Sequence, residues 1–302
     1  MWDGHPADFD TFWQSTLDDL ARYSAAAEVD VLPIRSTDFA TAYSVKLTSV
    51  GPYRLFGYLS IPRGDGPFPA IYYPPKYQSV LELIPQGSSN ELRSRFITFS
   101  LAARGQRNSD QPFSAMFPGL LTERIDDAPN YIFRGVVADA VRGQEYLLSR
   151  PEVDRSRVVS IGNDMALIAA SLHQDVSNVV CTPAIFFDSM NLAAKTGAYP
   201  LEEVNDYLNT FPGRRQAVAE SLAYLDLRGF VPKVQASTLL MTDAPGGLMD
   251  GSTLQPAAQA VPGKTTVHDS ESSSYKDGMF IENWLAGEFG YQEALVPRHW
   301  QD

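Results

Sequence analysis

The chain has 302 residues, of which 44% are hydrophobic and 20% charged, a composition typical of a folded globular protein and not of a disordered one. A formal net charge of -12 disfavours nucleic acids and anionic membranes as partners, because both are polyanions. The single cysteine, Cys181, excludes a disulfide framework and a cysteine-based zinc cluster, and no cofactor or metal is expected.

The first 60 residues are predicted to form a helix followed by edge strands. Apolar side chains from Phe9 to Ala21 recur at helical spacing, which indicates an amphipathic helix. Two segments with β-type alternation follow, at 42–50 and 53–61, separated by Pro52. We expect these segments to form an antiparallel edge of a larger sheet.

From residue 69 onward, short apolar runs alternate with helical patterns. This alternation predicts βαβ units and a mostly parallel sheet. Residues 186–235 contain no clear strand and are interpreted as a helical insertion. Because no linker-like composition divides the chain, residues 1–302 are predicted to form one domain. The expected strands are 69–73, 96–101, 157–161, 178–185, 237–242 and 264–268, and the expected helices are 136–148, 166–172 and 277–289.

The candidate site lies where the strand at 157–161 turns directly into a helix. The turn reads Gly162-Asn163-Asp164-Met165-Ala166, and its context is that of a nucleophile elbow, which usually reads Gly-x-Ser-x-Gly. Here an aspartate occupies the central position. We expect it to stand on an exposed, strained turn, a placement that would favour a functional role.

Several further motifs are shared with one known group of proteins. The chain resembles the acetyl xylan esterase / cephalosporin C deacetylase family of α/β-hydrolases, carbohydrate esterase family seven, from about residue 9 to residue 290. The resemblance implies an α/β-hydrolase fold and a homo-oligomeric assembly. The motifs that carry it are Arg104-Gly105-Gln106, Tyr131-Ile132-Phe133-Arg134, Asp139-Ala140-Val141-Arg142, the segment 151–158, Leu222-Ala223-Tyr224-Leu225-Asp226 and Ser252-Thr253.

The resemblance also implies that catalytic positions of the family have changed. The family's nucleophilic serine corresponds to Asp164, and the glutamine after it, which offers an oxyanion-hole N–H, corresponds to Met165. The oxyanion-hole tyrosine is matched by Tyr77, but the glycine before it is Lys76. The intact turn Arg104-Gly105-Gln106 is expected to support the loops of the site.

The acid and the histidine of the family have no clear counterparts. The family's acid lies in a Gly-Leu-x-Asp motif. Counting back from Ser252 without gaps places this acid at Gly246. The segment Gly247-Leu248-Met249-Asp250 matches the motif a few residues later, and Asp243 is a third candidate. The family's histidine falls near Ser274, in a loop that contains no histidine. The nearest one, His268, is expected to be a strand residue, although it could serve as a base. Asp269 and Glu271 are interpreted as surface charges that could also replace the lost base.

Three roles remain open for Asp164. It could be a general acid or base, a nucleophile that attacks an epoxide or an alkyl halide, or a remnant of a lost site. An ionised carboxylate needs no base to attack, but hydrolysis of the resulting ester does. Asn163, Met165, Lys76 and Tyr77 are expected to line the substrate pocket, where the lysine could lower the pKa of the aspartate or orient an anionic group.

The main hypothesis is an α/β-hydrolase-fold enzyme repurposed for non-hydrolytic acid/base chemistry in specialised metabolism. Its substrate would be a small, partly apolar molecule, and cyclisation, rearrangement or carbon–carbon bond formation would suit the site. The alternatives are an inactive ligand-binding protein, an aspartate-nucleophile hydrolase and an esterase with a rearranged triad. The start of the chain has no basic and apolar leader, and no apolar run reaches about 18 residues, so a cytoplasmic protein is expected.

Overall fold

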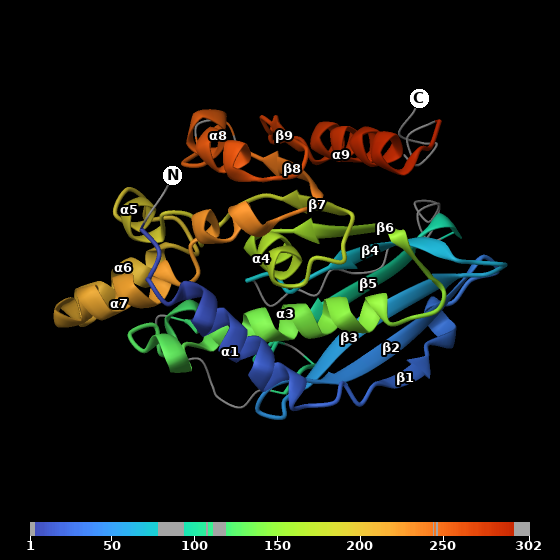
Figure 1. Cartoon of the computed structure of the whole chain (residues 1–302), viewed down its shortest axis with the longest axis horizontal. Helices are drawn as coiled ribbons and strands as arrows, with labels where there is room; N and C mark the ends of the chain where they lie inside the picture. Colours follow the sequence, from blue (N-terminus) through green and yellow to red (C-terminus); the bar gives the residue numbers. More distant parts are fainter. Residues whose placement is uncertain are drawn as a thin grey trace.

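The computed structural model describes residues 4–77, 94–106, 108–110, 119–243, 245 and 247–292. Their centre is a nine-stranded sheet in the order β1-β2-β3-β5-β4-β6-β7-β8-β9 (Figure 1). The strands are β1 (Glu28–Val31), β2 (Ala40–Thr48), β3 (Arg54–Pro62), β4 (Phe68–Tyr73), β5 (Ile97–Ala102), β6 (Val153–Gly162), β7 (Asn178–Cys181), β8 (Ser237–Met241) and β9 (Thr265–His268).

The sheet has an antiparallel part and a parallel part. β1, β2, β3 and β5 pair antiparallel in that order, whereas every neighbouring pair from β5 to β9 is parallel. This confirms the expected mostly parallel sheet with an antiparallel edge. Because the carboxyl ends of parallel strands share one edge of the sheet, the strands β4 to β9 all end at that edge.

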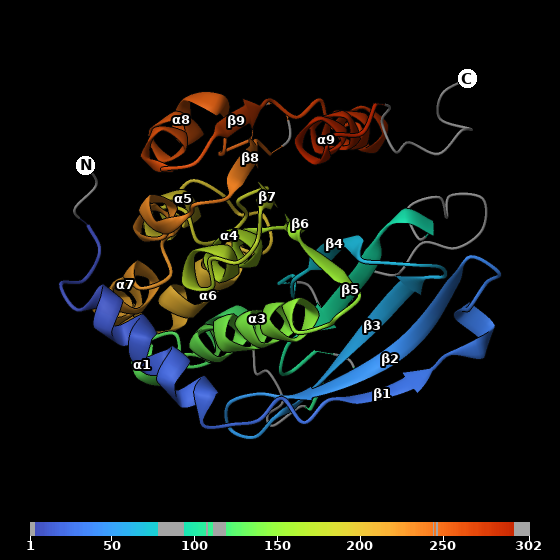
Figure 2. The ribbon, with the colours of Figure 1, turned by 45° about the vertical axis from the view of Figure 1, so that its right-hand side comes forward.

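Helices cover both faces of the sheet. On one face α1 (Phe9–Ala21) lies beside α3 (Ile132–Leu148), and α3 packs on α4 (Asp164–Leu172) (Figure 2). On the other face Leu285 and Phe289 of α9 (Ser274–Phe289) pack against Ile71, Val159 and neighbouring side chains of the sheet. Alternate strand residues therefore enter two separate cores, which explains why the strands read as continuous apolar runs.

Residues 186–235 contain helices and no strand. These helices are α5 (Ser189–Ala193), α6 (Glu202–Thr210) and α7 (Arg215–Ala223), together with short 3-10 turns. Among the described helices, none is long and apolar enough to cross a membrane.

Three features differ from the sequence prediction. β1 was missed because all four of its residues are exposed, so it shows no alternation of buried and exposed positions. The helix α8 (Gly251–Ala260) was also missed, since it contains Pro256, a residue that usually interrupts helices. The strand expected at 178–185 ends at Cys181, because Pro183 has no backbone N–H and the N–H groups of the next three residues donate to the carboxylate of Asp164 instead of to a neighbouring strand.

Glu282 of α9 makes stability depend on pH. Burial raises the pKa of its carboxyl to about 7, and Oε2 has no hydrogen-bond partner among the described residues. The fold therefore favours the protonated form, so this stabilisation is fully present below the unfolded pKa of 4.5 and is lost as the pH rises through about 7. This rise in pKa corresponds to about 3 kcal/mol in the free energy of unfolding, and the partial exposure of the side chain to water reduces that contribution to about 2 kcal/mol.

We expect Glu282→Gln to unfold at a higher urea concentration than the wild type at pH 8 and at a similar one at pH 4.5. Glu220→Gln, a change of an exposed glutamate on α7, is the matched control and should show no such pH dependence. An identical difference at both pH values would show that Glu282 is not protonated selectively by the fold.

Candidate functional site

Asp164 stands at the carboxyl edge of the parallel sheet. β6 ends at Gly162, Asn163 is the N-cap, and Asp164 is the first residue of α4. Ligands of open α/β sheets commonly bind beyond the carboxyl ends of the strands. The sequence therefore places this aspartate where a reacting group of such a protein would stand.

The carboxylate of Asp164 is turned into the protein and accepts backbone hydrogen bonds. The N–H of Phe186 donates to Oδ1 over 2.9 Å, and the N–H groups of Ile185 and Ala184 approach both oxygens at 3.3–3.4 Å. The residue is only 3% exposed. Burial raises the pKa of the carboxyl, whereas these backbone hydrogen bonds oppose the rise. The side chain thus ties the start of α4 to the loop after β7.

The expectation of an exposed, strained elbow was wrong. Among the described residues, the non-glycine positions with positive φ are Ala26, Arg124, Asp188 and Ser272, and Asp164 is not one of them. A nucleophile elbow holds its central residue on a strained turn that pushes the side chain outward. Here Asp164 is part of α4 without a positive φ, and its side chain points inward to the loop N–H groups.

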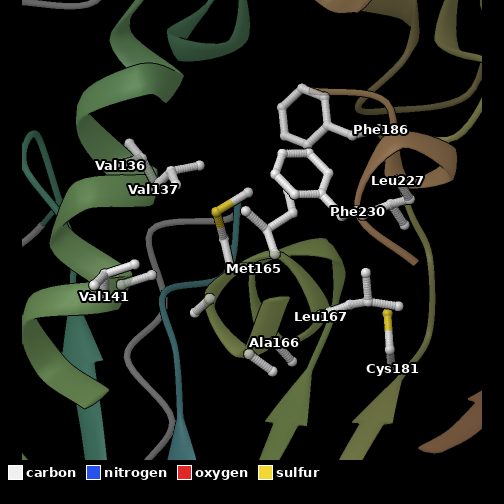
Figure 3. Close-up of a cluster of buried hydrophobic side chains, with 14 of the residues drawn as sticks. Val136, Val137, Val141, Met165, Ala166, Leu167, Cys181, Phe186, Leu227 and Phe230 are labelled. Atoms are coloured by element: carbon white, nitrogen blue, oxygen red, sulfur yellow. The ribbon is translucent and has the colours of Figure 1, made fainter. Parts of the chain in front are cut away.

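The neighbours of Asp164 also serve the packing. Asn163 donates its side-chain N–H to the carbonyl of Thr182 over 2.9 Å. Figure 3 shows the Met165 side chain among Val137, Phe186 and Phe230, and Met165 is buried. Asn163 and Met165, two of the four predicted pocket residues, thus make contacts within the protein.

The turn at Arg104-Gly105-Gln106 fastens the loop after β4. Gly105 has φ +78°, a conformation that suits glycine. The side chain of Gln106 accepts the N–H of Ala103 over 2.7 Å and donates to the carbonyl of Lys76. The turn therefore connects the end of β5 with the segment that carries Lys76 and Tyr77.

Tyr77 pairs with a carboxyl that the sequence analysis missed. Its hydroxyl donates to Oε1 of Glu203 on α6, and the N–H of Leu121 donates to Oε2 over 3.2 Å. Burial raises the pKa of Glu203 and of Tyr77. The two residues are 126 positions apart, and Glu203 belongs to no motif, so no sequence signal links them. A phenol and a carboxyl in direct contact form a pair that could donate or accept a proton.

The two candidate acids lie beyond β8, and Gly246 lies outside the described residues. Asp250 caps α8: it accepts the hydroxyl of Ser252 and the N–H of Thr253, each over 2.7 Å, and these bonds lower the pKa of its carboxyl. Asp243 accepts the N–H of Met249 over 3.2 Å. Both line a cleft of about 480 Å³ together with Asp269, Ser270 and Glu271.

His268 ends β9 and packs against α9. Its ring stacks on Phe280 at 3.8 Å, and Nε2 lies 3.3 Å from Oδ1 of Asp277. Asp277 also accepts the N–H of Glu271 and the hydroxyl of Ser270, so it holds the loop after β9. Ser274 is the first residue of α9. The imidazole is therefore fixed between the last strand and the last helix.

The arrangement combines an enclosed carboxylate, a phenol–carboxyl pair and an acidic cleft. No group of three histidine, cysteine, aspartate or glutamate side chains among the described residues could hold a metal ion. Asp164 has the position of a reacting residue but the surroundings of a structural one. Proton transfer is the chemistry best matched by Tyr77 and Glu203.

Comparisons with known proteins agree on one family. The family model for acetyl xylan esterase matches residues 2–261. Acetyl esterase Axe7A of Xylanibacter ruminicola is 26% identical over 243 residues, which make up 76% of this chain and 54% of that protein. The chain thus spans about half the length of this curated relative.

Solved structures share the fold. Acetyl xylan esterase 1 from Thermoanaerobacterium sp. matches with a TM-score of 0.80 and 21% identity, covering 94% of this chain and 95% of that one. The acetyl xylan esterase from Paenibacillus sp. R4 matches with a TM-score of 0.78 and the same identity and coverage. The expected α/β-hydrolase fold is confirmed.

Proposed function

Because this chain belongs to the acetyl xylan esterase family, we propose that it binds a small, partly apolar molecule without hydrolysing it by a serine mechanism. The observation that carries this proposal is the enclosure of the Asp164 carboxylate. A nucleophile must reach the carbon that it attacks, and this side chain is instead directed toward three backbone N–H groups.

The contacts of His268 support the same conclusion. A serine nucleophile needs an adjacent base, and an aspartyl ester intermediate needs one for its hydrolysis. The histidine nearest to the expected loop, His268, stacks on Phe280 and pairs with Asp277 instead. The contacts of Asp164 and His268 therefore disfavour both an aspartate-nucleophile hydrolase and an esterase with a rearranged triad.

The relatives indicate which ligands to test first. One of them is named an acetyl esterase and two are named acetyl xylan esterases, so acetylated sugars are the first class of ligand to test. Such molecules combine hydroxyl groups with an apolar acetyl group.

Non-hydrolytic acid/base chemistry is the second candidate. It is favoured by the contact between Tyr77 and Glu203, because a carboxyl with a raised pKa next to a phenol is a typical proton donor or acceptor. In an enzyme of this kind, Glu203 would donate a proton to the substrate or accept one from it. Asp164, the residue first considered for this role from the sequence, would hold the loop after β7 in place.

The test compares hydrolysis of p-nitrophenyl acetate by the wild type, Asp164→Ser and Asp164→Ala. We expect all three to remain at the background rate, because restoring the serine alone does not restore a base. Circular dichroism should show that each variant is folded under the assay conditions. Wild-type hydrolysis that disappears in Asp164→Ala would contradict the proposal and indicate an active esterase.

Ligand experiments with the wild type and two glutamate variants distinguish binding from the second candidate. Calorimetry with acetylated xylo-oligosaccharides should show binding to the wild type, and mass spectrometry should show an unchanged ligand. Conversion of the ligand that is lost in Glu203→Gln but kept in Glu202→Gln, a change of the adjacent glutamate on α6, would favour acid/base chemistry instead.

A further inference from the structure

A cleft of about 300 Å³ opens between α1, the turn joining β2 to β3, and the N-terminus of α3. We refer to it as the α1–α3 cleft. It contains no residue of the elbow or of the pair formed by Tyr77 and Glu203. Its lining includes Asp19, Tyr53, Arg104, Glu123, Arg124 and Gly135.

Arg104 brings a buried guanidinium to the wall of this cleft. The residue is 6% exposed, Nε and Nη2 donate to the carboxylate of Asp139, and Nη2 also donates to the carbonyl of Val50. Nη1 makes no hydrogen bond with any part of the chain that the structure describes. Because Arg104 lines the cleft and this nitrogen has no acceptor among the described residues, its N–H groups can donate to an acceptor that enters the cleft.

Gly135 of α3 creates the space for that nitrogen. A Cβ atom at this position would lie 2.4 Å from Nη1 of Arg104, closer than atoms can approach. The Tyr53 ring covers the guanidinium from another side, with Cζ 4.6 Å from the ring centroid. The guanidinium is thus held between Tyr53 and Gly135, both of which line the cleft.

Arg124 adds a second cation in an unusual backbone conformation. Its φ is +57°, a region that non-glycine residues rarely adopt, and the residue is exposed. Its side chain makes no hydrogen bond or ion pair with the residues described here, yet it lines the cleft. Strained residues of this kind concentrate at ligand-binding sites.

The remaining charges of the cleft decide which ligand fits. Arg134 is already paired with Asp19 over 2.9 Å, so neither contributes a free charge. The N-terminus of α3, a helix of 17 residues, contributes a partial positive charge. The carboxylate of Glu123 also lines the cleft and opposes an anion.

From Nη1 of Arg104, the unpaired Arg124 and the N-terminus of α3, we propose that the α1–α3 cleft binds a small oxyanion, a carboxylate or a phosphate group. Two oxygens of such a group can accept from the two guanidinium groups at once. Glu123 limits the affinity, since its carboxylate repels the bound anion.

Equilibrium dialysis with radiolabelled acetate and radiolabelled inorganic phosphate, at constant ionic strength, tests this proposal. We expect saturable binding of one equivalent of at least one of the two anions, with a dissociation constant at or below about 1 mM. Saturation by both would identify a general oxyanion site, and preference for one would identify its source as a carboxylate or a phosphate.

Three variants make the test specific. Arg124→Gly suits the left-handed backbone, so it should fold with an unchanged or higher Tm while binding about tenfold more weakly. Glu123→Gln should bind several-fold more tightly, and Arg155→Gln, which removes a surface arginine of β6, should bind as the wild type does. The proposal is overturned if neither anion saturates the wild type by about 10 mM, or if Arg124→Gly binds with wild-type affinity.

Discussion

Replacing Asp164 with alanine is expected to lower the free energy of unfolding by about 3 kcal/mol. The substitution removes the acceptor of the Phe186 N–H at 2.9 Å and of two longer contacts from Ile185 and Ala184. Each buried N–H left without an acceptor costs about 1–3 kcal/mol, and the longer contacts contribute at the lower end of that range. Urea denaturation at pH 7 measures the difference.

Two further variants separate the hydrogen bonds from the loss of volume. Asp164→Asn keeps the shape and one acceptor oxygen, so we expect about half the loss seen with alanine. Asp175→Ala, an exposed aspartate paired with Arg155, should change stability by less than about 1 kcal/mol. A loss of similar size in Asp164→Ala and Asp175→Ala would mean that the elbow carboxylate does not support the loop.

The hydrogen bonds between Asp164 and the loop after β7 also affect the shape of the candidate site. The loop from Ala184 to Phe186 follows β7 at the carboxyl edge of the sheet, where ligands of this fold bind. A carboxylate that holds this loop in place shapes one wall of the candidate site. In the binding protein that we propose, the aspartate at the elbow would therefore be important for ligand binding without reacting with the ligand.

The fold could be predicted from the sequence because its signals are local. Apolar runs of strand length, helical spacing from Phe9 onward and the turn at Gly162 identify their elements without knowledge of partners. The elements that were missed lack such signals: β1 is exposed on every residue, and α8 contains Pro256. The family resemblance then implied the α/β-hydrolase fold.

For the candidate site, the sequence motifs indicated two of the residues but not the contacts that these residues make. Asp164 and Tyr77 were found from motifs, but their partners were not. The partners of Asp164 are backbone N–H groups, which every residue except proline carries and which no residue type reveals. Glu203 contacts Tyr77 although the two residues are 126 positions apart in the sequence. The space around Nη1 of Arg104 exists only because residue 135 is a glycine. These relations arise from tertiary structure.

The buried ion pair of Arg104 and Asp139 gives the second large expected effect. Asp139 is fully buried on α3 and accepts the backbone N–H and Nε of Arg104, each over 2.9 Å, and Nη2 over 2.7 Å. Burial alone would lower the pKa of Arg104, but Asp139 outweighs it and raises the pKa. We expect Asp139→Ala to lower the free energy of unfolding by about 3–5 kcal/mol, because the guanidinium remains buried without its counter-charge.

A double-mutant cycle shows whether the charge pair is the cause. Arg104→Ala should cost a similar amount, whereas the double variant should cost less than the two single losses added together, since it leaves no unpaired charge behind. The difference, measured by urea denaturation at pH 7, is expected to be about 2 kcal/mol or more. Additive losses would mean that the two side chains stabilise the protein independently, through packing, and that the turn at Arg104-Gly105-Gln106 does not depend on Asp139.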